Sequence, residues 1–229
     1  MTAFYKENDR FFVAVDCIIF GFSDGELSLL LFKRNVEPAK GCWSLPGGFI
    51  KEHESSEEAA SRVLNTLTGL SNLYMEQLRL FSEENRDPGE RVLSIAYYAL
   101  VNVADYDREL VQQYNAYWRN INDLPELIFD HNEMFRVALE RLRHKASTEP
   151  VGFNLLPEKF TVPQLQSLYE AIYGRKVDKR NFRKKIQTMD FVEKSEEKDK
   201  SGSKRGAFLY TFNKKLYEQA LHKGFSFTL

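Results

Sequence analysis

Residues 48–70, GFIKEHESSEEAASRVLNTLTGL, contain the motif that decides the fold. Ser55 can cap a helix, and Glu58 three residues later completes a capping box. Apolar residues recur at helical spacing at positions 60, 63, 64 and 67, up to Gly69, which can end the helix. The stretch therefore predicts a loop that begins at Gly48 and leads into one amphipathic helix.

The same stretch resembles the Nudix box, which runs Gly, five residues, Glu, seven residues, then Arg-Glu-apolar-x-Glu-Glu-x-Gly-apolar. Six residues agree with that pattern: Gly48, Glu54, Arg62, Leu64, Gly69 and Leu70. Val63, Thr66 and Leu67 stand where the three metal-binding glutamates belong. Glutamates at this spacing would share one helix face and converge on a divalent cation, which prefers carboxylate oxygens. Without them we expect no catalytic residue, no metal site and no cofactor.

Other carboxylates near the box leave an alternative open. A Nudix hydrolase could use Glu54, Glu57 or Glu58 in place of the missing glutamates. Acids in the first turn also stabilise a helix through its dipole, which is the simpler interpretation of Glu57 and Glu58. Glu54 and Arg62 can likewise form a structural ion pair.

The composition indicates an ordinary globular chain. Its 229 residues suffice for one or two domains, with 43% apolar and 28% charged residues. No apolar run approaches the roughly 18 residues of a membrane helix, and the N-terminal residues lack the apolar segment of a secretory signal. Cys17 and Cys42 form neither a disulfide framework nor a metal-site spacing. We therefore expect a cytoplasmic protein with no membrane partner.

The net charge of −1 conceals an asymmetry between the two halves of the chain. Residues 1–146 hold 16 Lys+Arg and 23 Asp+Glu, a net charge of −7, whereas residues 147–229 hold 16 and 10, a net charge of +6. A basic half indicates a nucleic-acid surface. The segment Thr148-Glu149-Pro150-Val151-Gly152 interrupts the periodicity, so we place one domain at residues 1–147 and another at residues 153–229.

The acidic half alternates strands with a few helices. Strands are predicted at 11–22 and 27–34 around a turn at 23–26, at about 75–82 and 91–103, and near 117–118. An amphipathic helix is predicted at 131–143. Together with the box helix, this order fits the α/β/α sandwich that the Nudix resemblance implies.

The basic half follows the order helix, turn, basic helix and β-hairpin, which is typical of a winged helix-turn-helix. Thr161 can cap a first helix that Gly174 ends, and Asp178 can cap a second helix at 179–189. Strands are predicted at 191–194 and 206–212, with a polar tip at 195–205 between them.

The second helix carries the residues that can contact double-stranded DNA. In a major groove, Arg180 and Arg183 can pair with guanine and Asn181 with adenine, while its lysines meet phosphates. The hairpin tip can touch the backbone or minor groove, although its acids at 196, 197 and 199 oppose that contact. A solvated basic face is the alternative. The predicted DNA-binding residues are Lys179, Arg180, Asn181, Arg183, Lys184, Lys204 and Arg205, with Lys185 as a further phosphate contact.

A glutamate-depleted Nudix box joined to a winged helix resembles the Nudix-related transcriptional regulators, the NrtR family. Residues 160–186, FTVPQLQSLYEAIYGRKVDKRNFRKKI, are similar to the family's DNA-binding core. The resemblance covers roughly residues 10–215 and implies a homodimeric repressor or activator whose Nudix domain senses a small molecule. One branch of the family responds to ADP-ribose, and a Bacteroidetes branch responds to pentoses such as L-arabinose. The segments DPGERVLSIAYYAL, WRNINDLP and LIFDHNEM are more similar to the arabinose branch, so a pentose is the expected effector and ADP-ribose the alternative.

Without the family resemblance, the residue types give only a weak preference between a pentose and ADP-ribose. A diphosphate needs clustered Arg or Lys, whereas a neutral sugar needs a few hydrogen-bonding groups and an aromatic wall. The acidic Nudix half favours the sugar. Candidate effector-binding residues are Trp43, Glu54, Asp87, Arg91, Asp130 and His131. Trp43 can instead belong to the core, and Asp130 or His131 can cap the helix that follows.

Overall fold

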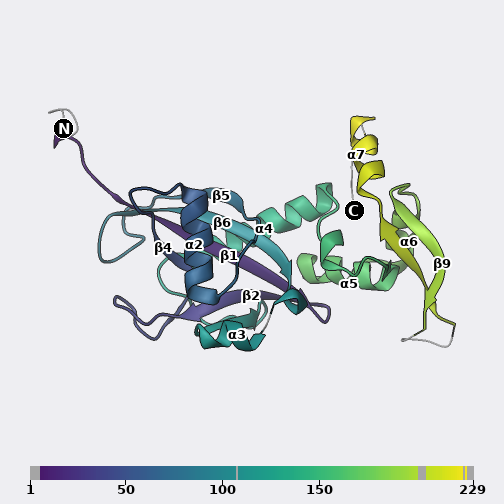
Figure 1. Cartoon of the computed structure of the whole chain (residues 1–229), viewed down its shortest axis with the longest axis horizontal. Helices are drawn as coiled ribbons and strands as arrows, with labels where there is room; N and C mark the ends of the chain where they lie inside the picture. The colour runs from purple at the N-terminus through teal and green to yellow at the C-terminus, as the bar shows by residue number, and fades with distance from the viewer. Residues whose placement is uncertain (1–5, 107, 201–204, 224, 226–229) are drawn as a thin grey trace. The chain divides into compact units, whose positions relative to one another are not determined.

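The computed structural model describes residues 6–106, 108–200, 205–223 and 225. It divides into two compact units, which Figure 1 shows with their elements labelled. The first unit contains Met1–Gly21, Ser28–Leu100 and Ala104–Ala138, and the second contains Phe22–Leu27, Val101–Val103 and Leu139–Leu229.

A seven-stranded sheet forms the centre of the first unit. Its main path has the order β3-β2-β1-β6-β5, with β4 beside β1 and β7 beside β2. The strands are β1 (Phe12–Ser23), β2 (Glu26–Lys33), β3 (Trp43–Ser44), β4 (Gly47–Phe49), β5 (Glu76–Phe81), β6 (Val92–Asn102) and β7 (Ala116–Asn120). The β4 register sets Gly48 opposite Val15 and Gly47 opposite Asp16, which brings the start of the box against the central strand.

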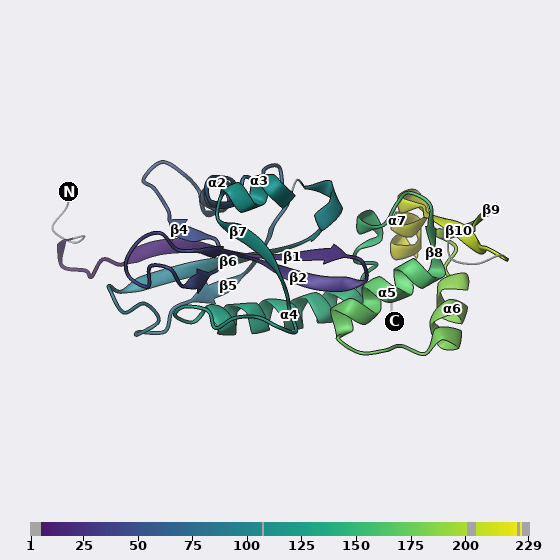
Figure 2. The same cartoon turned by 90° about the horizontal axis from the view of Figure 1, so that it is seen from below.

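Helices cover both faces of this sheet. They are α2 (Ser56–Thr68), the short α3 (Arg108–Gln113) and the first part of α4 (His131–Thr148), with a 3-10 turn η1 (Val103–Asp105). Figure 2 shows α2 and α3 on one face and α4 on the other. Phe135 of α4 lies against Phe20 of β1, with ring centroids 6.0 Å apart. The predicted α/β/α sandwich is therefore confirmed.

The local signals in the sequence explain these elements. Ser55 and Glu58 form the predicted capping box at the start of α2, and Gly69 ends the helix at φ 75°. The β1–β2 turn places Asp24 at φ 54° and Gly25 at φ 80°, the left-handed pair that matches strand twist in a two-residue hairpin. Nine consecutive residues of β1, from Ala14 to Phe22, are buried, so this strand is the core of the sandwich.

The second unit is a winged helix. It contains η2 (Phe153–Leu155), β8 (Phe160–Thr161), α5 (Val162–Tyr173), α6 (Lys179–Gln187), β9 (Val192–Asp199), β10 (Ala207–Phe212) and α7 (Lys214–His222). Its sheet has the order β8-β10-β9. Thr161 caps α5 through a capping box with Gln164, and Asp178 caps α6, as the sequence predicts.

Several boundaries differ from the sequence prediction. Helix α4 continues to Thr148 and α6 ends at Gln187, while β9 runs on to Asp199 through residues predicted as the hairpin tip. Ladder pairing with β10 holds β9 in place although its side chains are mostly exposed. The elements α3, β8 and α7 were not predicted. Among the described helices, none is long and apolar enough to cross a membrane.

Candidate functional site

Glu54 and Arg62 of the box bind each other. Arg62 Nε donates to Glu54 Oε2 over 2.8 Å, and Arg62 Nη2 also donates to the carbonyl of Phe49 over 3.0 Å. The Lys51 N–H donates to the other carboxylate oxygen over 2.8 Å. The hydrogen bond from Arg62 lowers the pKa of Glu54 to about 2. The pair therefore fixes the loop before α2, which is the structural role left open by the sequence.

The helix face that holds metal in a complete Nudix box does not fit a metal here. Val63 is buried, and its methyl group would lie 3.0 Å from a Cβ added to Gly48. Thr66 is exposed and Leu67 half-buried, and neither carries a carboxylate. Within the described ranges, no group of three or more His, Cys, Asp or Glu side chains could hold a metal ion. The Val63 side chain instead packs between α2 and β4.

A cavity of about 370 Å³ lies beside β4 in the first unit. Its apolar side chains come from Phe12, Ala14, Val36, Pro38, Phe49, Val92 and Phe129, and its polar ones from Asp16, Arg34, Glu37, Ser44, Arg86, Asp87, Glu90 and His131. We call it the Nudix cavity. Pockets of this size and mixture take small ligands, with a few polar groups fixing their orientation.

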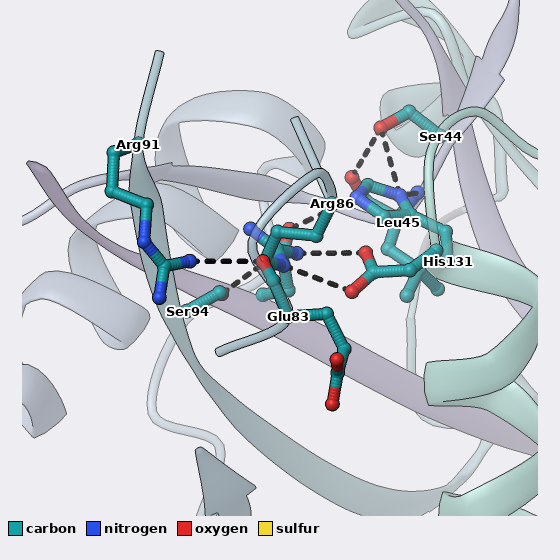
Figure 3. A network of polar contacts seen from close by, with 9 residues as sticks. Ser44, Leu45, Glu83, Arg86, Arg91, Ser94 and His131 are labelled. Atoms are coloured by element: carbon teal, nitrogen blue, oxygen red, sulfur yellow. Dashed lines mark hydrogen bonds and ion pairs between the residues drawn. The ribbon is translucent and has the colours of Figure 1, made fainter. Parts of the chain in front are cut away.

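A buried polar network, shown in Figure 3, forms one wall of the Nudix cavity. Arg86 binds Asp130 through two hydrogen bonds of 2.9 and 2.8 Å. Its Nη2 also lies 3.6 Å from Asp16 Oδ2, which accepts a 2.6 Å hydrogen bond from Ser94. The side chains of Arg86 and Asp16 are only 3% and 7% exposed. The guanidinium therefore balances two carboxylates away from water.

His131 completes the buried polar network in a single orientation. Its Nδ1 accepts a 3.1 Å hydrogen bond from the Leu45 N–H, so the ring proton lies on Nε2, 3.6 Å from Asp16 Oδ1. Burial lowers the pKa of His131, although Asp16 and Asp130 oppose that shift. A neutral ring at neutral pH follows, with its N–H directed at the Asp16 carboxylate.

The structure brings only part of the predicted effector set together. Asp87 and His131 line the Nudix cavity. Asp130 is not one of the residues that line the cavity and is bound to Arg86, which does line it. Their contact with an effector stays a prediction.

The other three candidates are occupied elsewhere. Trp43 packs edge-on against Tyr117 at 5.5 Å and lies under the Arg119 guanidinium at 4.7 Å. Glu54 holds the box through Arg62, and Arg91 donates to the carbonyl of Glu83 over 2.9 Å. None of these three belongs to the described residues that line the Nudix cavity.

Helix α6 of the second unit presents a basic face. Phe182 and Ile186 are buried and anchor it, and Asp178 accepts a 2.7 Å hydrogen bond from the Asn181 N–H. The exposed residues are Lys179, Arg180, Asn181, Arg183, Lys184 and Lys185. Within the described residues, none of these cations enters an ion pair. The face is therefore free to meet an external anion.

A groove of about 360 Å³ runs between α6 and the wing strand β10, and Lys179 and Arg183 line it together with Phe208. Across the hairpin, Lys194 and Lys198 lie 3.6 and 4.4 Å from the Phe208 ring centroid. Two basic side chains of the helix thus border the groove, and two lysines of the wing lie over an aromatic ring that also lines it.

The acidic residues of the wing oppose DNA less than their number suggests. Glu197 is paired with Lys159, outside the groove. Because side chains alternate along a strand, Glu197 and Asp199 point away from the face that carries Lys194 and Lys198. The same alternation leaves Glu196 as the one acid on that face among the described wing residues. Arg205 is exposed. Lys204, predicted as a DNA contact, lies outside the described residues.

Both units match known domain families. The NUDIX domain profile matches residues 10–140, and the profile described as the NrtR DNA-binding winged helix domain matches residues 152–212. Over 204 residues the chain is 31% identical to the ADPR responsive transcriptional repressor NtrR of Acinetobacter baylyi, covering 87% of this chain and 81% of that protein. The chain belongs to the NrtR family.

Solved structures agree with this assignment. The NrtR of Shewanella oneidensis complexed with a 27mer DNA is 29% identical, with a TM-score of 0.77, and the match covers 94% of this chain and 97% of that one. The NUDIX domain of the same protein complexed with ADP ribose is 31% identical, with a TM-score of 0.52 over 62% of this chain and 99% of that one. A Nudix domain joined to an NrtR-type DNA-binding domain is the organisation of a transcriptional regulator.

In this NrtR-family chain, sequence reasoning missed half of the buried polar network. Asp16 is the single charge in the apolar run FFVAVDCIIFGF, which is a signal of a buried, partnered acid. Arg86 gave no such signal, because it stands in a polar turn and its partner Asp130 is 44 positions away.

Proposed function

We propose that the protein is a DNA-binding repressor whose Nudix cavity binds ADP-ribose and whose DNA affinity changes when ADP-ribose binds. The observation that carries this proposal is the match, along most of the chain, to a repressor described as ADPR responsive. The likeness to a Nudix domain complexed with ADP ribose supports it. ADP-ribose therefore takes precedence over the pentose that the sequence alone favours.

Linkage between the two sites gives the test. A duplex selected by the purified protein from a random pool serves as DNA, and its affinity is measured by gel shift with and without ADP-ribose. A coupled effector changes DNA affinity by about 5- to 150-fold, and DNA must change effector affinity by the same factor. Equal DNA affinity in both conditions would remove ADP-ribose as the effector.

One observation keeps a pentose as the second candidate. The Nudix cavity is lined by the carboxylates of Asp16, Glu37, Asp87 and Glu90, against the cations Arg34 and Arg86. Asp130 already pairs with Arg86. A neutral sugar meets no repulsion from such a lining, whereas a diphosphate does. L-arabinose and xylose therefore belong in the same gel shift, and a response to them alone would transfer the role to the pentose.

The basic face of α6 supports the DNA-binding part of the proposal. Contacts to phosphates release counterions, so affinity should fall with salt at a log–log slope of about −0.9 per phosphate neutralised. Arg183→Ala should weaken binding by roughly 1–3 kcal/mol and relax specificity at one base position. The control is Arg136→Ala, an exposed arginine of the Nudix domain. A flat salt response would contradict DNA binding through this face.

We infer that the box no longer supports metal-assisted hydrolysis, because none of Val63, Thr66 and Leu67 supplies a carboxylate. Glu54, the best-placed replacement, is held by Arg62. Incubation with ADP-ribose and magnesium should therefore release no AMP. Robust turnover that Glu54→Gln abolishes would restore the hydrolase alternative.

A homodimer in the cytoplasm completes the proposal. Two winged helices can read a palindromic operator whose symmetric half-sites lie about one helical turn apart. Sedimentation equilibrium of the free protein should give twice the mass of the 26.7 kDa chain. A monomer at micromolar concentration would remove this part of the proposal alone.

A further inference from the structure

One carboxylate oxygen of the buried polar network accepts no hydrogen bond from any residue that the structure describes. Asp16 Oδ2 accepts the hydrogen bond from Ser94 and faces Arg86, but within the described residues Oδ1 accepts no hydrogen bond. Its polar neighbour is His131 Nε2 at 3.6 Å, beyond hydrogen-bond distance. Oδ1 is not fully enclosed, since it is not one of the buried side-chain oxygens that lack a partner, and an accessible carboxylate oxygen can accept from water or from a ligand. Asp16 lines the Nudix cavity, so its free acceptor is available to a ligand.

The Gly47 backbone packs directly against Oδ1. A Cβ at Gly47 would collide with Oδ1, so glycine is needed beside this carboxylate. Asp130 engages Arg86 with both of its oxygens, and His131 accepts from Leu45 and is therefore neutral. No unpaired cation among the described residues of the network can thus receive a phosphate here. An uncharged donor suits this end of the cavity, and a second anion does not.

The geometry points to Asp16 as the residue that selects the end of the effector. We propose that Oδ1 accepts a hydrogen bond from a hydroxyl of an unphosphorylated pentose and that the same carboxylate rejects a phosphorylated end. The inference deepens the proposed function and rests on it, because it assumes that the Nudix cavity holds the effector. A free pentose and the terminal ribose of ADP-ribose share this chemistry.

Arg34 gives the effector a direction. It also lines the Nudix cavity, and within the described part of the chain no carboxylate pairs with it. Its Nε donates to the carbonyl of Pro38 over 3.0 Å, which holds it in place while other N–H groups remain. The diphosphate of ADP-ribose is therefore placed towards Arg34, with its terminal pentose at Asp16.

Isothermal titration of the full chain with two pairs of probes tests the proposal. ADP-ribose is compared with ADP, which lacks the terminal pentose, and D-ribose with D-ribose 5-phosphate. Within the pair that binds the wild-type protein, the probe that ends in an unphosphorylated pentose should bind more tightly than the other. Asp16→Asn should reduce that preference about tenfold or more, because the acceptor loses its negative charge, which weakens the hydrogen bond from the hydroxyl and removes the repulsion of phosphate. The pair that binds identifies the source of the pentose.

Controls separate the possible outcomes. Asp123→Asn removes an exposed carboxylate of the Nudix domain that does not line the cavity, and it should leave the preference between probes unchanged. An equal loss of preference in both variants would assign selection to the overall charge and overturn the role of Asp16. An unchanged preference in Asp16→Asn, with its thermal unfolding still cooperative, would overturn it as well. Binding of no probe to the wild-type protein would instead contradict the proposed function.

Discussion

Replacing Arg86 tests the buried polar network in the Nudix domain. Its side chain is 3% exposed and binds Asp130, whose side chain is 18% exposed, through two hydrogen bonds. Arg86→Met keeps the aliphatic bulk but leaves Asp130 and Asp16 without their cation. Removing one partner of a buried ion pair costs about 3–5 kcal/mol, because the remaining charge stays away from water. We expect a loss of that size in the free energy of unfolding.

Urea unfolding followed by tryptophan fluorescence measures this loss. Both tryptophans, Trp43 and Trp118, lie in the Nudix sheet, so the signal reports that domain. Arg86→Met combined with Asp130→Asn should recover part of the stability, since the orphaned charge is removed. The control Arg136→Met breaks a similar pair at a side chain that is 59% exposed and should cost less than about 1 kcal/mol. A loss below about 1 kcal/mol for Arg86→Met would refute the reasoning.

Three further changes have defined outcomes. Val63→Glu should destabilise the Nudix domain by several kcal/mol in the same urea assay without restoring hydrolysis, since it buries a carboxylate against Gly48. Asp178→Ala should cost about 1 kcal/mol of α6 stability and weaken DNA binding in the gel shift, because it removes the N-cap. A hydrogen bond from Lys176 lowers the pKa of Glu170 from 4.5 to about 2. The ionised Glu170 therefore stabilises α5 above pH 4.5, and this stabilisation is lost as the pH falls from 4.5 to 2. Amide exchange in α5 measures this pH dependence, and Glu170→Gln should abolish it.

The sequence predicts the elements whose signals are local. The caps Ser55, Thr161 and Asp178 define three helix starts because each side chain bonds a backbone N–H three residues away. Burial on one face produces the periodicity of α2, whereas β1 is recognised as a continuous run of β-branched and aromatic residues because it is buried along most of its length. The sequence predicts the start of the wing strand β9 but not its continuation to Asp199, because this exposed part has no buried face and pairing with β10 decides its length.

The Nudix cavity is less predictable because its residues come from distant segments. Asp87 and His131 are found from their residue types near the box, but Asp16 and Ser94 meet across 78 positions. No pattern within one segment announces such a pair. Effector binding by Trp43 and Glu54 stays a prediction, although the structure engages Trp43 in ring packing and Glu54 in an ion pair.

The most direct test of the account is the reciprocal linkage between the Nudix cavity and DNA. Fluorescence anisotropy gives the affinity for the selected duplex with and without saturating ADP-ribose, and titration gives the affinity for ADP-ribose with and without the duplex. We expect ADP-ribose to change the affinity for the duplex by at least about fivefold, and the duplex to change the affinity for ADP-ribose by the same factor. If neither ADP-ribose nor L-arabinose changes the affinity for DNA, although one of them binds the cavity, regulation of DNA binding through the Nudix cavity is contradicted.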